Sequence, residues 1–385
     1  MEALTALARE SGFAAATWQH AVIFIVGGLL IYLAVRHNYE PLLLVPIGFG
    51  AIMANLPQAG LSAGSPVFAG SGYTPGGLLQ HVYDTGIATQ VLPPVIFLGV
   101  GALTDFRPLL ARPLTFLLGA AAQLGIFVAA IAAAYLFGFT HREAASIGII
   151  GGADGPTTIF VASRLAPHML GAVAVAAYSY MSLVPIIQPP VMRALTTQAE
   201  REIAMPPARE VSQTAVIVFP IATAMLASLF VPSCAPLVGL LMFGNLLRET
   251  GVTDRLSKTA GGALINIATI FLGLVVGATI SGPSFLTPKT LGVLVLGAVA
   301  FVFGTAGGVL FAKGMNLFLP QHLKLNPCIG AAGVSAVPMS ARVVQNFVSR
   351  STDGRVNPLM PAMGPNVAGV VGSAIVAGVF LALLE

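Results

Sequence analysis

Asp154 is an acidic residue in a position that a lipid bilayer disfavours. It lies in Ser146-Ile-Gly-Ile-Ile-Gly-Gly-Ala-Asp-Gly-Pro-Thr-Thr-Ile-Phe160, and of the 14 Asp and Glu residues it alone is deep inside a long apolar segment. A carboxylate at membrane depth costs at least about 2.5 kcal/mol, so such residues usually serve a function. The neighbouring glycines and Pro156 interrupt a simple helix. A broken helix beside a buried carboxylate is typical of the cation sites of transporters.

The chemistry predicted for Asp154 is binding of a small hard cation, Na⁺ or H⁺. Oxygen donors suit such ions. Thr157, Thr158 and the backbone carbonyls that the break leaves free would supply further oxygens. The alternative is an Asp that caps a helix at an interface. We favour the cation, because Asp154 lies about ten residues inside the polar flank of its segment.

A second Gly-rich segment, residues 327–347, carries another set of polar residues. Asn326 and Ser335 could supply neutral oxygens to an ion or could bond neighbouring helices, and the sequence leaves these two interpretations even. Arg342 could bind a carboxylate through its planar guanidinium, or it could extend to the cytoplasmic surface. For Arg164 in the first segment, extension to the outer surface is the preferred interpretation.

Two tyrosines and an asparagine lie near other interruptions of apolar segments. Tyr178 and Tyr180 fall within a span that ends at Pro190, and Asn366 lies beside a Gly-Pro pair near the start of the last span. Either tyrosine could relay a proton or face an ion, although a packed ring with one hydrogen bond is the commoner arrangement. Polar residues at several breaks favour one shared site.

The composition predicts an all-α polytopic membrane protein. Of the 385 residues, 56% are hydrophobic and 8% are charged, whereas soluble domains have about 25% charged residues. The Lys and Arg residues are scattered, which argues against a nucleic-acid partner. No Walker A pattern and no dinucleotide fingerprint is present, so ATP is not the expected energy source.

Twelve apolar segments flank the polar linker 193–213, six on each side. The fifth and the eleventh, 144–163 and 327–347, hold the polar motifs, and we interpret each as a re-entrant hairpin. About ten transmembrane helices remain, five in residues 1–192 and five in residues 214–385. An odd number of crossings inverts the second half relative to the first. The segments are 20–36, 41–58, 86–104, 114–138, 144–163, 168–192, 214–232, 235–248, 262–281, 290–312, 327–347 and 361–384.

The basic residues support this topology when the amino terminus is placed outside. Only Arg9, Arg142 and Lys289 then face outside, while the linker is cytoplasmic and the stretch 58–85 is an external loop without Lys or Arg. This distribution follows the positive-inside rule. The 13 residues assigned to the cytoplasm are Arg36, Arg107, Arg112, Arg193, Arg201, Arg209, Arg248, Arg255, Lys258, Lys313, Lys324, Arg350 and Arg355.

An internal repeat is also visible in the sequence, at offsets of 174 to 190 residues. Inverted repeats with paired broken segments place their binding site where the repeats meet, near mid-membrane. Asp154 aligns with Ala332, so the carboxylate belongs to one repeat and the site is asymmetric. The matching pairs are 96–102 with 270–278, 152–164 with 330–342, and Pro46 and Asn55 with Pro236 and Asn245.

The motifs Gly151-Gly-Ala-Asp-Gly-Pro-Thr-Thr-Ile-Phe160 and Asn326-Pro-Cys-Ile-Gly-Ala-Ala-Gly-Val-Ser-Ala-Val-Pro-Met-Ser-Ala-Arg342 resemble a known family. The chain is similar, over nearly its whole length, to the membrane beta subunit of the biotin-dependent, Na⁺-pumping decarboxylases. The family includes oxaloacetate, methylmalonyl-CoA and glutaconyl-CoA decarboxylases. In this family the beta subunit decarboxylates carboxybiotin, consumes a proton and exports Na⁺.

The resemblance implies roles for individual residues. Asp154 would be the Na⁺-binding carboxylate, and Arg342 would hold the carboxylate of carboxybiotin. The residues implied in catalysis are Asp154, Tyr180, Ser335 and Arg342, and those implied as Na⁺ ligands are Asp154, Asn326, Gly330, Ser335 and, as a looser match, Asn366.

The resemblance also implies an assembly. The partners would be an alpha subunit with biotin-carrier and carboxyltransferase functions and a small single-span gamma subunit, in an oligomer in the cytoplasmic (inner) membrane of a bacterium or archaeon. The fold would be that of an elevator-type transporter, and oxaloacetate is the first choice of substrate for the complex. The residues alone leave two alternatives open. One is a stand-alone secondary transporter that exchanges Na⁺ for a solute or for H⁺, and the other is a membrane scaffold without transport.

Overall fold

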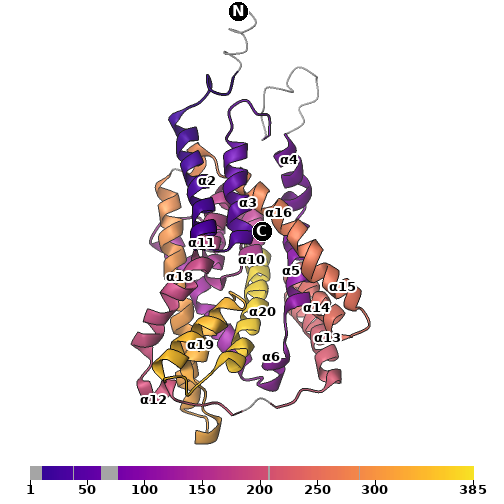
Figure 1. Ribbon diagram of the computed structural model, residues 1–385, viewed down its shortest axis with the longest axis vertical. Helices are drawn as coiled ribbons and strands as arrows, with labels where there is room; N and C mark the ends of the chain where they lie inside the picture. Colours follow the sequence, from indigo (N-terminus) through magenta and orange to yellow (C-terminus); the bar gives the residue numbers. More distant parts are fainter. Residues whose placement is uncertain (1–10, 38, 62–76, 207–208, 286) are drawn as a thin grey trace, which may run out of the picture.

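The computed structural model describes residues 11–37, 39–61, 77–206, 209–285 and 287–385. Arg9 and residues 62–76 of the expected external loop lie outside the described residues. Within these ranges every regular element is a helix and there is no strand. Figure 1 shows an elongated bundle in which most helices run along the long axis.

The helices of the first half end at Leu195. They are α2 (Trp18–His37), α3 (Pro41–Ala54), α4 (Leu78–Tyr83), η2 (Asp84–Ala88), α5 (Leu92–Leu103), α6 (Arg107–Ala111), α7 (Thr115–Ala122), α8 (Leu124–Tyr135), α9 (His141–Gly148), η3 (Ile149–Gly152), α10 (Gly155–Leu165), η4 (Pro167–Met169) and α11 (Leu170–Leu195).

The second half begins with the short helix α12 of the linker. Its helices are α12 (Gln198–Arg201), α13 (Gln213–Phe230), η5 (Pro232–Cys234), α14 (Ala235–Glu249), α15 (Asp254–Thr259), η6 (Ala260–Leu264), α16 (Ile265–Ala278), α17 (Gly282–Phe285), α18 (Pro288–Asn316), η7 (Gln321–Leu323), η8 (Pro327–Gly333), α19 (Met339–Ser351) and α20 (Leu359–Leu384).

Seven helices of the described ranges are long and apolar enough to cross a membrane, or eight if the bent pair before residue 104 is one span. The chain is therefore a polytopic membrane protein. The number is lower than the ten predicted, because α3 and α14 have only 14 and 15 residues. The segment predicted at 86–104 is also not straight: its two helices meet at 64°. Pro93 and Pro94 start the second of these helices.

Helices of the two halves pack against each other in a reciprocal way. α3 of the first half lies against α16 of the second, and α14 of the second lies against α5 of the first. Both contacts bring backbones together at glycine. A Cβ atom on Gly277 would lie 2.1 Å from the Ile47 carbonyl oxygen, and one on Gly101 would lie 1.9 Å from the Leu241 carbonyl oxygen. Small residues permit such close packing of membrane helices.

Two asparagines make the same bond in the two halves. The side-chain amide of Asn55 donates to the Ile280 carbonyl at 2.6 Å, and that of Asn245 donates to the Thr104 carbonyl at 2.9 Å. Each bond ties the end of one short helix to the end of its partner helix from the other half. A π-helical turn, η2 or η6, also lies near the start of both α5 and α16. An asparagine bond and a π-helical turn of this kind thus occur once in each half.

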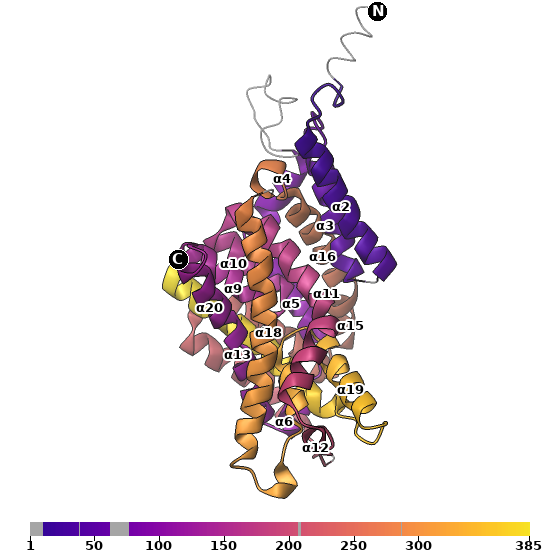
Figure 2. The ribbon, with the colours of Figure 1, turned by 90° about the vertical axis from the view of Figure 1, so that its left-hand side faces the viewer.

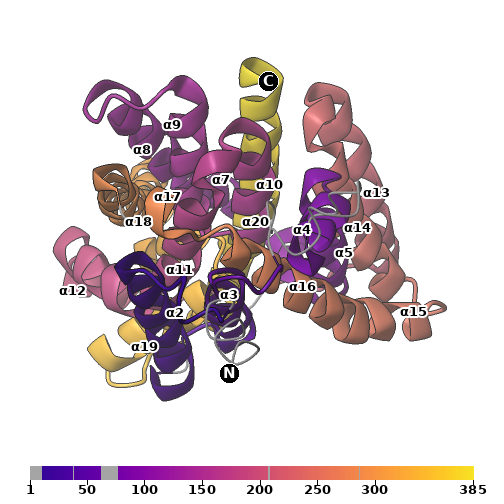
Figure 3. The ribbon, with the colours of Figure 1, turned by 90° about the horizontal axis from the view of Figure 1, so that it is seen from above.

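The described residues of the linker, 193–206 and 209–213, lie at one end of the bundle, which we call the linker end (Figure 1). Gln198 donates to the Ser351 carbonyl at 2.6 Å, and Glu200 pairs with Lys313 at 3.1 Å. The ends of α18 and α19 therefore meet α11 and α12 there. Figure 2 shows α18 running along most of the bundle to reach this end. Viewed from above, α10 and α20 separate α4, α5 and α13–α16 from α7–α9, α11 and α18 (Figure 3).

The opposite end of α18 approaches Glu143, a carboxylate that is only 5% exposed. Its oxygen Oε1 lies 3.2 Å from Nζ of Lys289 and 3.1 Å from Nε2 of His168, and Thr140 donates to its other oxygen at 2.8 Å. Burial raises the pKa of Glu143, but these hydrogen bonds outweigh burial and lower the pKa from 4.5 to about 2. The carboxylate therefore stabilises the fold while it is ionised.

We expect Glu143→Gln to lower stability at neutral pH and to do so less in acid. Because the folded-state pKa is depressed, the contribution is complete above about pH 4.5 and is lost as pH falls toward about 2. The shift corresponds to roughly 3 kcal/mol at most. Thermal unfolding in detergent should show a gap between wild type and variant that closes below pH 4.5. A gap that stays constant with pH, or an equal gap for the exposed Glu210→Gln, would contradict this assignment.

Candidate functional site

Asp154 lies at a break between two half-helices, as the sequence predicts. Helix α9 continues into the 3₁₀ turn η3, Ala153 adopts the left-handed conformation with φ of 56°, and Asp154 is extended. Non-glycine residues with positive φ are uncommon, and backbone strain of this kind concentrates at functional sites. Pro156 lies in the first turn of α10, where a missing N–H costs nothing.

Asp154 caps α10 and is buried. Its Oδ1 accepts from the Thr157 backbone N–H at 3.3 Å, and its Oδ2 accepts from the Thr157 hydroxyl at 2.7 Å and the Ser373 hydroxyl at 3.1 Å. Capping, the alternative to ion binding, is thus part of its role. It does not neutralise the charge: across the described ranges no Lys, Arg or His pairs with Asp154. A buried carboxylate without a cationic partner needs a bound cation or a proton.

The second broken segment meets the first at this point. After η8 the chain is extended at Val334, and the Ser335 N–H donates to the Gly152 carbonyl at 3.0 Å. The Ser335 hydroxyl lies 3.5 Å from the Ser373 hydroxyl, which itself bonds Asp154. Residues far apart in sequence, 154, 335 and 373, therefore form one polar cluster at the junction of the two segments.

Asn366 holds the second segment in place. Its side-chain Nδ2 donates to the carbonyls of Ala332 at 2.9 Å and Val334 at 3.0 Å. Its carbonyl oxygen Oδ1 is buried without a hydrogen-bond partner. A buried oxygen without a hydrogen-bond donor lowers stability by about 1–3 kcal/mol, unless a bound ion or water takes the place of the donor.

Gln123 presents a second oxygen of this kind and was not predicted from the sequence. Its Nε2 donates to the carbonyls of Gly119 at 3.0 Å and Gly369 at 3.3 Å, while its buried Oε1 has no partner. A Cβ atom on Gly152 would lie 3.8 Å from this Oε1 and 3.0 Å from the Cβ of Ser373. Gln123 therefore belongs to the same cluster. The only signal in the sequence is a single amide side chain between Ala120-Ala-Ala122 and Leu124.

The tyrosine beside the break is Tyr178. A Cβ atom on Gly155 would lie 2.6 Å from its hydroxyl oxygen, which is buried without a hydrogen-bond partner. Tyr180, which the family resemblance assigns to catalysis, instead donates its hydroxyl to the Leu294 carbonyl of α18 and packs against Phe301. The structure brings Tyr178, and not Tyr180, next to Asp154.

Three other predicted residues lie along the second segment and not at Asp154. Asn326 starts η8 at the linker end, where its Nδ2 donates to the Arg201 carbonyl at 2.8 Å. Its oxygen accepts from the Cys328 N–H at 3.1 Å. Gly330 packs directly on α18, and Arg342 is exposed in the first turn of α19. The polar cluster thus contains Asp154 and Ser335 of the predicted set, together with Gln123 and Ser373. Asn366 bonds the backbone of the second segment just before Ser335.

One carboxylate with several neutral oxygens fits a monovalent cation. Within the described part of the chain no group of three His, Cys, Asp or Glu residues could hold a metal ion. Divalent ions such as Ca²⁺ are usually held by several carboxylates and carbonyls. Gln123, Ser335 and Ser373 instead offer uncharged oxygens near the single charge of Asp154. The cluster has the donor types that a Na⁺ site requires.

Comparison with known proteins identifies the family. Residues 19–384 match the family described as the Na⁺-transporting oxaloacetate decarboxylase beta subunit. The chain is 53% identical over 387 residues to the methylmalonyl-CoA decarboxylase subunit beta of Veillonella parvula, covering 100% of this chain and 98% of the relative. It is 53% identical over 382 residues to the glutaconyl-CoA decarboxylase subunit beta of Acidaminococcus fermentans, covering 99% and 98%. It is 50% identical over 431 residues to the oxaloacetate decarboxylase beta chain of Klebsiella pneumoniae, covering 99% of each.

The matched range, residues 19–384, includes both broken segments and the polar cluster between them. The expected resemblance is confirmed at full length. The chain belongs to the family of membrane beta subunits of Na⁺-transporting, biotin-dependent decarboxylases.

Proposed function

We propose that this chain decarboxylates carboxybiotin delivered by a partner subunit and couples the reaction to Na⁺ export and proton uptake. The observation that carries this proposal is Asp154: a buried carboxylate, without a cationic partner among the described residues, at the junction of two broken segments. A group of this kind can exchange Na⁺ for H⁺, since either neutralises it. Exchange of the two would release Na⁺ on the side where the proton enters.

The proposed Na⁺ site consists of Asp154 and the hydroxyl of Ser373, completed by oxygens of Gln123, Ser335 and Asn366. It is supported by the hydrogen bonds that join Asp154 to Ser373 and Ser373 to Ser335, and by the unpartnered oxygens of the Gln123 and Asn366 amides. In this assignment Gly330 and Asn326 position the second segment. Tyr178 lies beside Gly155, next to Asp154, whereas Tyr180 links α11 to α18.

We expect Gln123→Met to weaken Na⁺ binding without abolishing transport. Methionine has a similar length but no amide oxygen, so one neutral ligand is lost. A hydrogen-bond-strength contribution of about 1.5 kcal/mol corresponds to roughly a tenfold higher Na⁺ concentration at half-maximal turnover. Turnover at saturating Na⁺ should change little. The control is Gln321→Met in η7, at an exposed residue outside the cluster. An unchanged Na⁺ dependence for Gln123→Met would remove Gln123 from the site.

We further propose that residues 1–192 and 214–385 are inverted repeats, each with five spans and one re-entrant hairpin, arranged as in elevator-type transporters. The proposal is supported by the reciprocal helix contacts and by the positions of the hairpin ends. Arg142 and Arg164, which flank segment 144–163, both bond Glu385. The start and end of segment 327–347 both lie at the linker end. The tips of the two segments meet between these ends.

The proposed orientation places the linker end in the cytoplasm of a bacterial or archaeal cell. Arg107 pairs with Glu249, and Arg355 with Glu202, at this end. Of the described basic residues, Arg142, Arg164 and Lys289 contact the opposite end. An excess of Lys and Arg on one side is the mark of the cytoplasmic face.

The proposed complex contains an alpha subunit that carries biotin and transfers the carboxyl group, a small single-span gamma subunit, and more than one copy of the assembly. The substrate of the complex would be chosen by the alpha subunit. The chain has nearly equal sequence identity to beta subunits of methylmalonyl-CoA, glutaconyl-CoA and oxaloacetate decarboxylases. Oxaloacetate remains the first choice among them.

The deciding experiment is uptake of ²²Na⁺ into inverted proteoliposomes that hold this chain with its co-purifying partners. We expect uptake that requires a decarboxylation substrate and stops when avidin blocks biotin. Uptake by the chain alone, driven by an ion gradient and unaffected by avidin, would contradict the proposal and assign a secondary transporter.

A further inference from the structure

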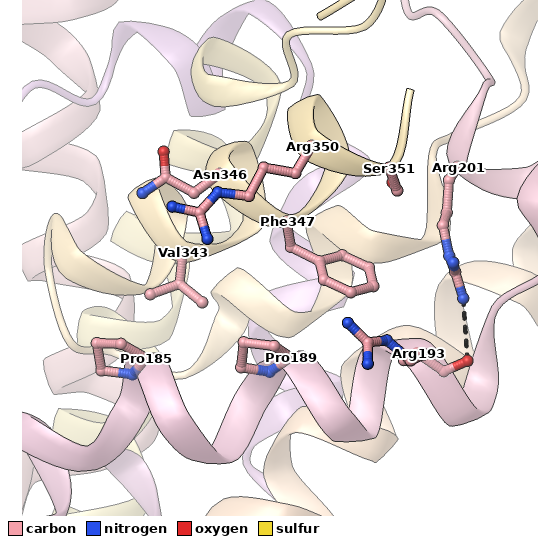
Figure 4. A pocket seen from close by; sticks show the side chains of 9 residues that line it. All are labelled: Pro185, Pro189, Arg193, Arg201, Val343, Asn346, Phe347, Arg350 and Ser351. Carbon is pink, nitrogen blue, oxygen red and sulfur yellow. Dashed lines mark hydrogen bonds between the residues drawn. The ribbon is translucent and has the colours of Figure 1, made fainter. Parts of the chain in front are cut away.

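A cavity of about 370 Å³ opens between α11 and α19 at the linker end. It is separate from the polar cluster around Asp154, with which it shares no residue. Its size falls within the range of small-molecule binding pockets. It is lined by Pro185, Pro189, Arg193, Arg201, Val343, Asn346, Phe347, Arg350 and Ser351 (Figure 4).

The two walls of the cavity are formed by one face of α11 and one face of α19. Pro185, Pro189 and Arg193 follow one another at intervals of four residues on α11, and Asn346 and Arg350 do so on α19. Residues at this spacing lie on one face of a helix. Figure 4 shows the side chains of Asn346 and Arg350 on the wall opposite the two prolines and Arg193.

The cavity is rich in positive charge that is not neutralised. In the described ranges neither Arg193 nor Arg350 forms an ion pair. The guanidinium group of Arg201 already has partners within the protein. It donates to the Thr196 hydroxyl at 2.9 Å and to the Arg193 carbonyl at 3.0 Å. It also lies 5.1 Å from the centre of the Phe347 ring. Two guanidinium groups are thus free to bind an anion, and the third is fixed against the floor of the cavity.

The α11 wall also offers hydrogen-bond acceptors. A proline in a helix lacks the N–H that would bond the carbonyl four residues before it. Pro185 and Pro189 therefore leave the carbonyls of Met181 and Pro185 without their helical donors. The cavity combines cationic donors with the apolar faces of Val343 and Phe347, and one of its walls is a helix with carbonyls freed by proline.

We propose that this cavity binds the carboxylated ureido ring presented by the biotin carrier. The inference rests on the proposed function and adds the place and the residues of binding. Arg193 and Arg350 would bind the carboxylate and the ureido oxygen, because guanidinium groups match planar oxygen pairs. The remaining ring N–H would donate to a carbonyl freed by proline, and the apolar part of the ring would lie against Phe347.

The position of the cavity connects such a ligand with the ion site. Arg342 lies four residues before Asn346 and eight before Arg350, about 12 Å nearer the junction along the same face of α19. On the other wall, Gln188 of α11 donates to the Ala331 carbonyl of η8 at 2.8 Å. A ligand that draws α11 and α19 together would act on the segment that ends at the Ser335–Gly152 bond. The carboxylated ring, with its carboxylate still attached, could then move along α19 from Arg350 toward Arg342.

The test measures decarboxylation of a biotin carrier that has been carboxylated with ¹⁴C in advance, by the purified complex at saturating Na⁺. We expect Arg193→Gln and Arg350→Gln each to raise the carrier concentration at half-maximal rate about tenfold, because each removes a charged hydrogen bond. The maximal rate and the Na⁺ dependence should change less than about twofold. Arg350→Lys should restore part of the loss.

The matched control is Arg255→Gln, an exposed arginine of α15 that does not line the cavity. Unchanged half-saturation in the double variant Arg193→Gln/Arg350→Gln would overturn the cavity assignment, while Na⁺ transport by the complex would leave the proposed function intact. An equal effect of Arg255→Gln would also overturn it, because general surface charge would then explain the result. If the wild-type complex released no ¹⁴CO₂ from the carrier, both proposals would fail.

Discussion

Asp154→Asn is expected to abolish Na⁺-dependent decarboxylation and Na⁺ uptake while the protein still folds. Asparagine keeps the size of the side chain and an oxygen that can accept from Thr157 and Ser373, so the cap on α10 survives. It removes the one formal charge of the polar cluster. Loss of one partner of a buried ion pair costs about 3–5 kcal/mol, so Na⁺ affinity should fall at least about 100-fold.

The measurement is ²²Na⁺ uptake by the reconstituted complex at several Na⁺ concentrations, together with the rate of CO₂ release. Folding is checked by size-exclusion elution and thermal unfolding. Asp254→Asn, at an exposed carboxylate of α15, is the matched control and should transport as wild type does. A folded Asp154→Asn protein that pumps at the normal rate would refute the ion site. A scaffold without transport predicts instead that Asp154→Ala is harmless.

Coupling also requires that the site lose its ion on the outer side. Moving one charge against the membrane potential costs about 2.3 kcal/mol per 100 mV. A carboxylate can meet this requirement, because protonation removes the charge that holds Na⁺. The variant should therefore lose both uptake and coupling, since an amide cannot take up the proton.

The positions of the long helices could be predicted from the sequence, because apolar length alone determines which segments can cross a bilayer. The segments predicted at 168–192, 290–312 and 361–384 correspond to α11, α18 and α20. The bend of 64° before α5 was not predicted. Its signal is the pair Pro93-Pro94, since proline favours the first turn of a new helix.

The broken segment at Asp154 was also predictable, because Gly-Gly-Ala-Asp-Gly-Pro cannot form a regular helix. The rest of the cluster was not. Ser373 reaches Asp154, and Gln123 reaches the neighbouring Gly152, only through the packing of α7, α8 and α20. A lone Gln or Ser in a bundle is usually a helix contact. Tyr178 and Tyr180 differ by about 200° around the axis of α11. Which one faces the break depends on the rotation of that helix, which local sequence does not determine.

Gly330→Ala is expected to disable the complex by displacing the second broken segment. A Cβ atom on Gly330 would lie 2.1 Å from the Gly308 carbonyl oxygen of α18, and one on Gly308 would lie 2.0 Å from that of Gly330. In both cases the added Cβ atom would clash with a backbone carbonyl. A change of side-chain rotamer therefore cannot relieve the clash. Overpacking of this kind typically costs about 1–3 kcal/mol, and here η8 must move away from α18.

Such a movement would reach the ion site. Gly330 lies five residues before Ser335, whose N–H bonds the Gly152 carbonyl beside Asp154. A misplacement of about 1 Å at a reacting group can cost about 100-fold in rate. We therefore expect Gly330→Ala to lose about 100-fold in Na⁺-dependent decarboxylation and to unfold at a lower temperature than wild type.

The same variant separates two roles for Gly330. The family resemblance makes it a Na⁺ ligand, and a ligand at this position would act through its backbone carbonyl, which alanine keeps. If ligation were its only role, Gly330→Ala would retain nearly normal turnover. If close packing against Gly308 is what matters, turnover and stability fall together, and the matched Gly314→Ala changes neither, because no atom lies within 4 Å of a Cβ there. A large shift in Na⁺ dependence with unchanged stability would favour direct ligation over packing.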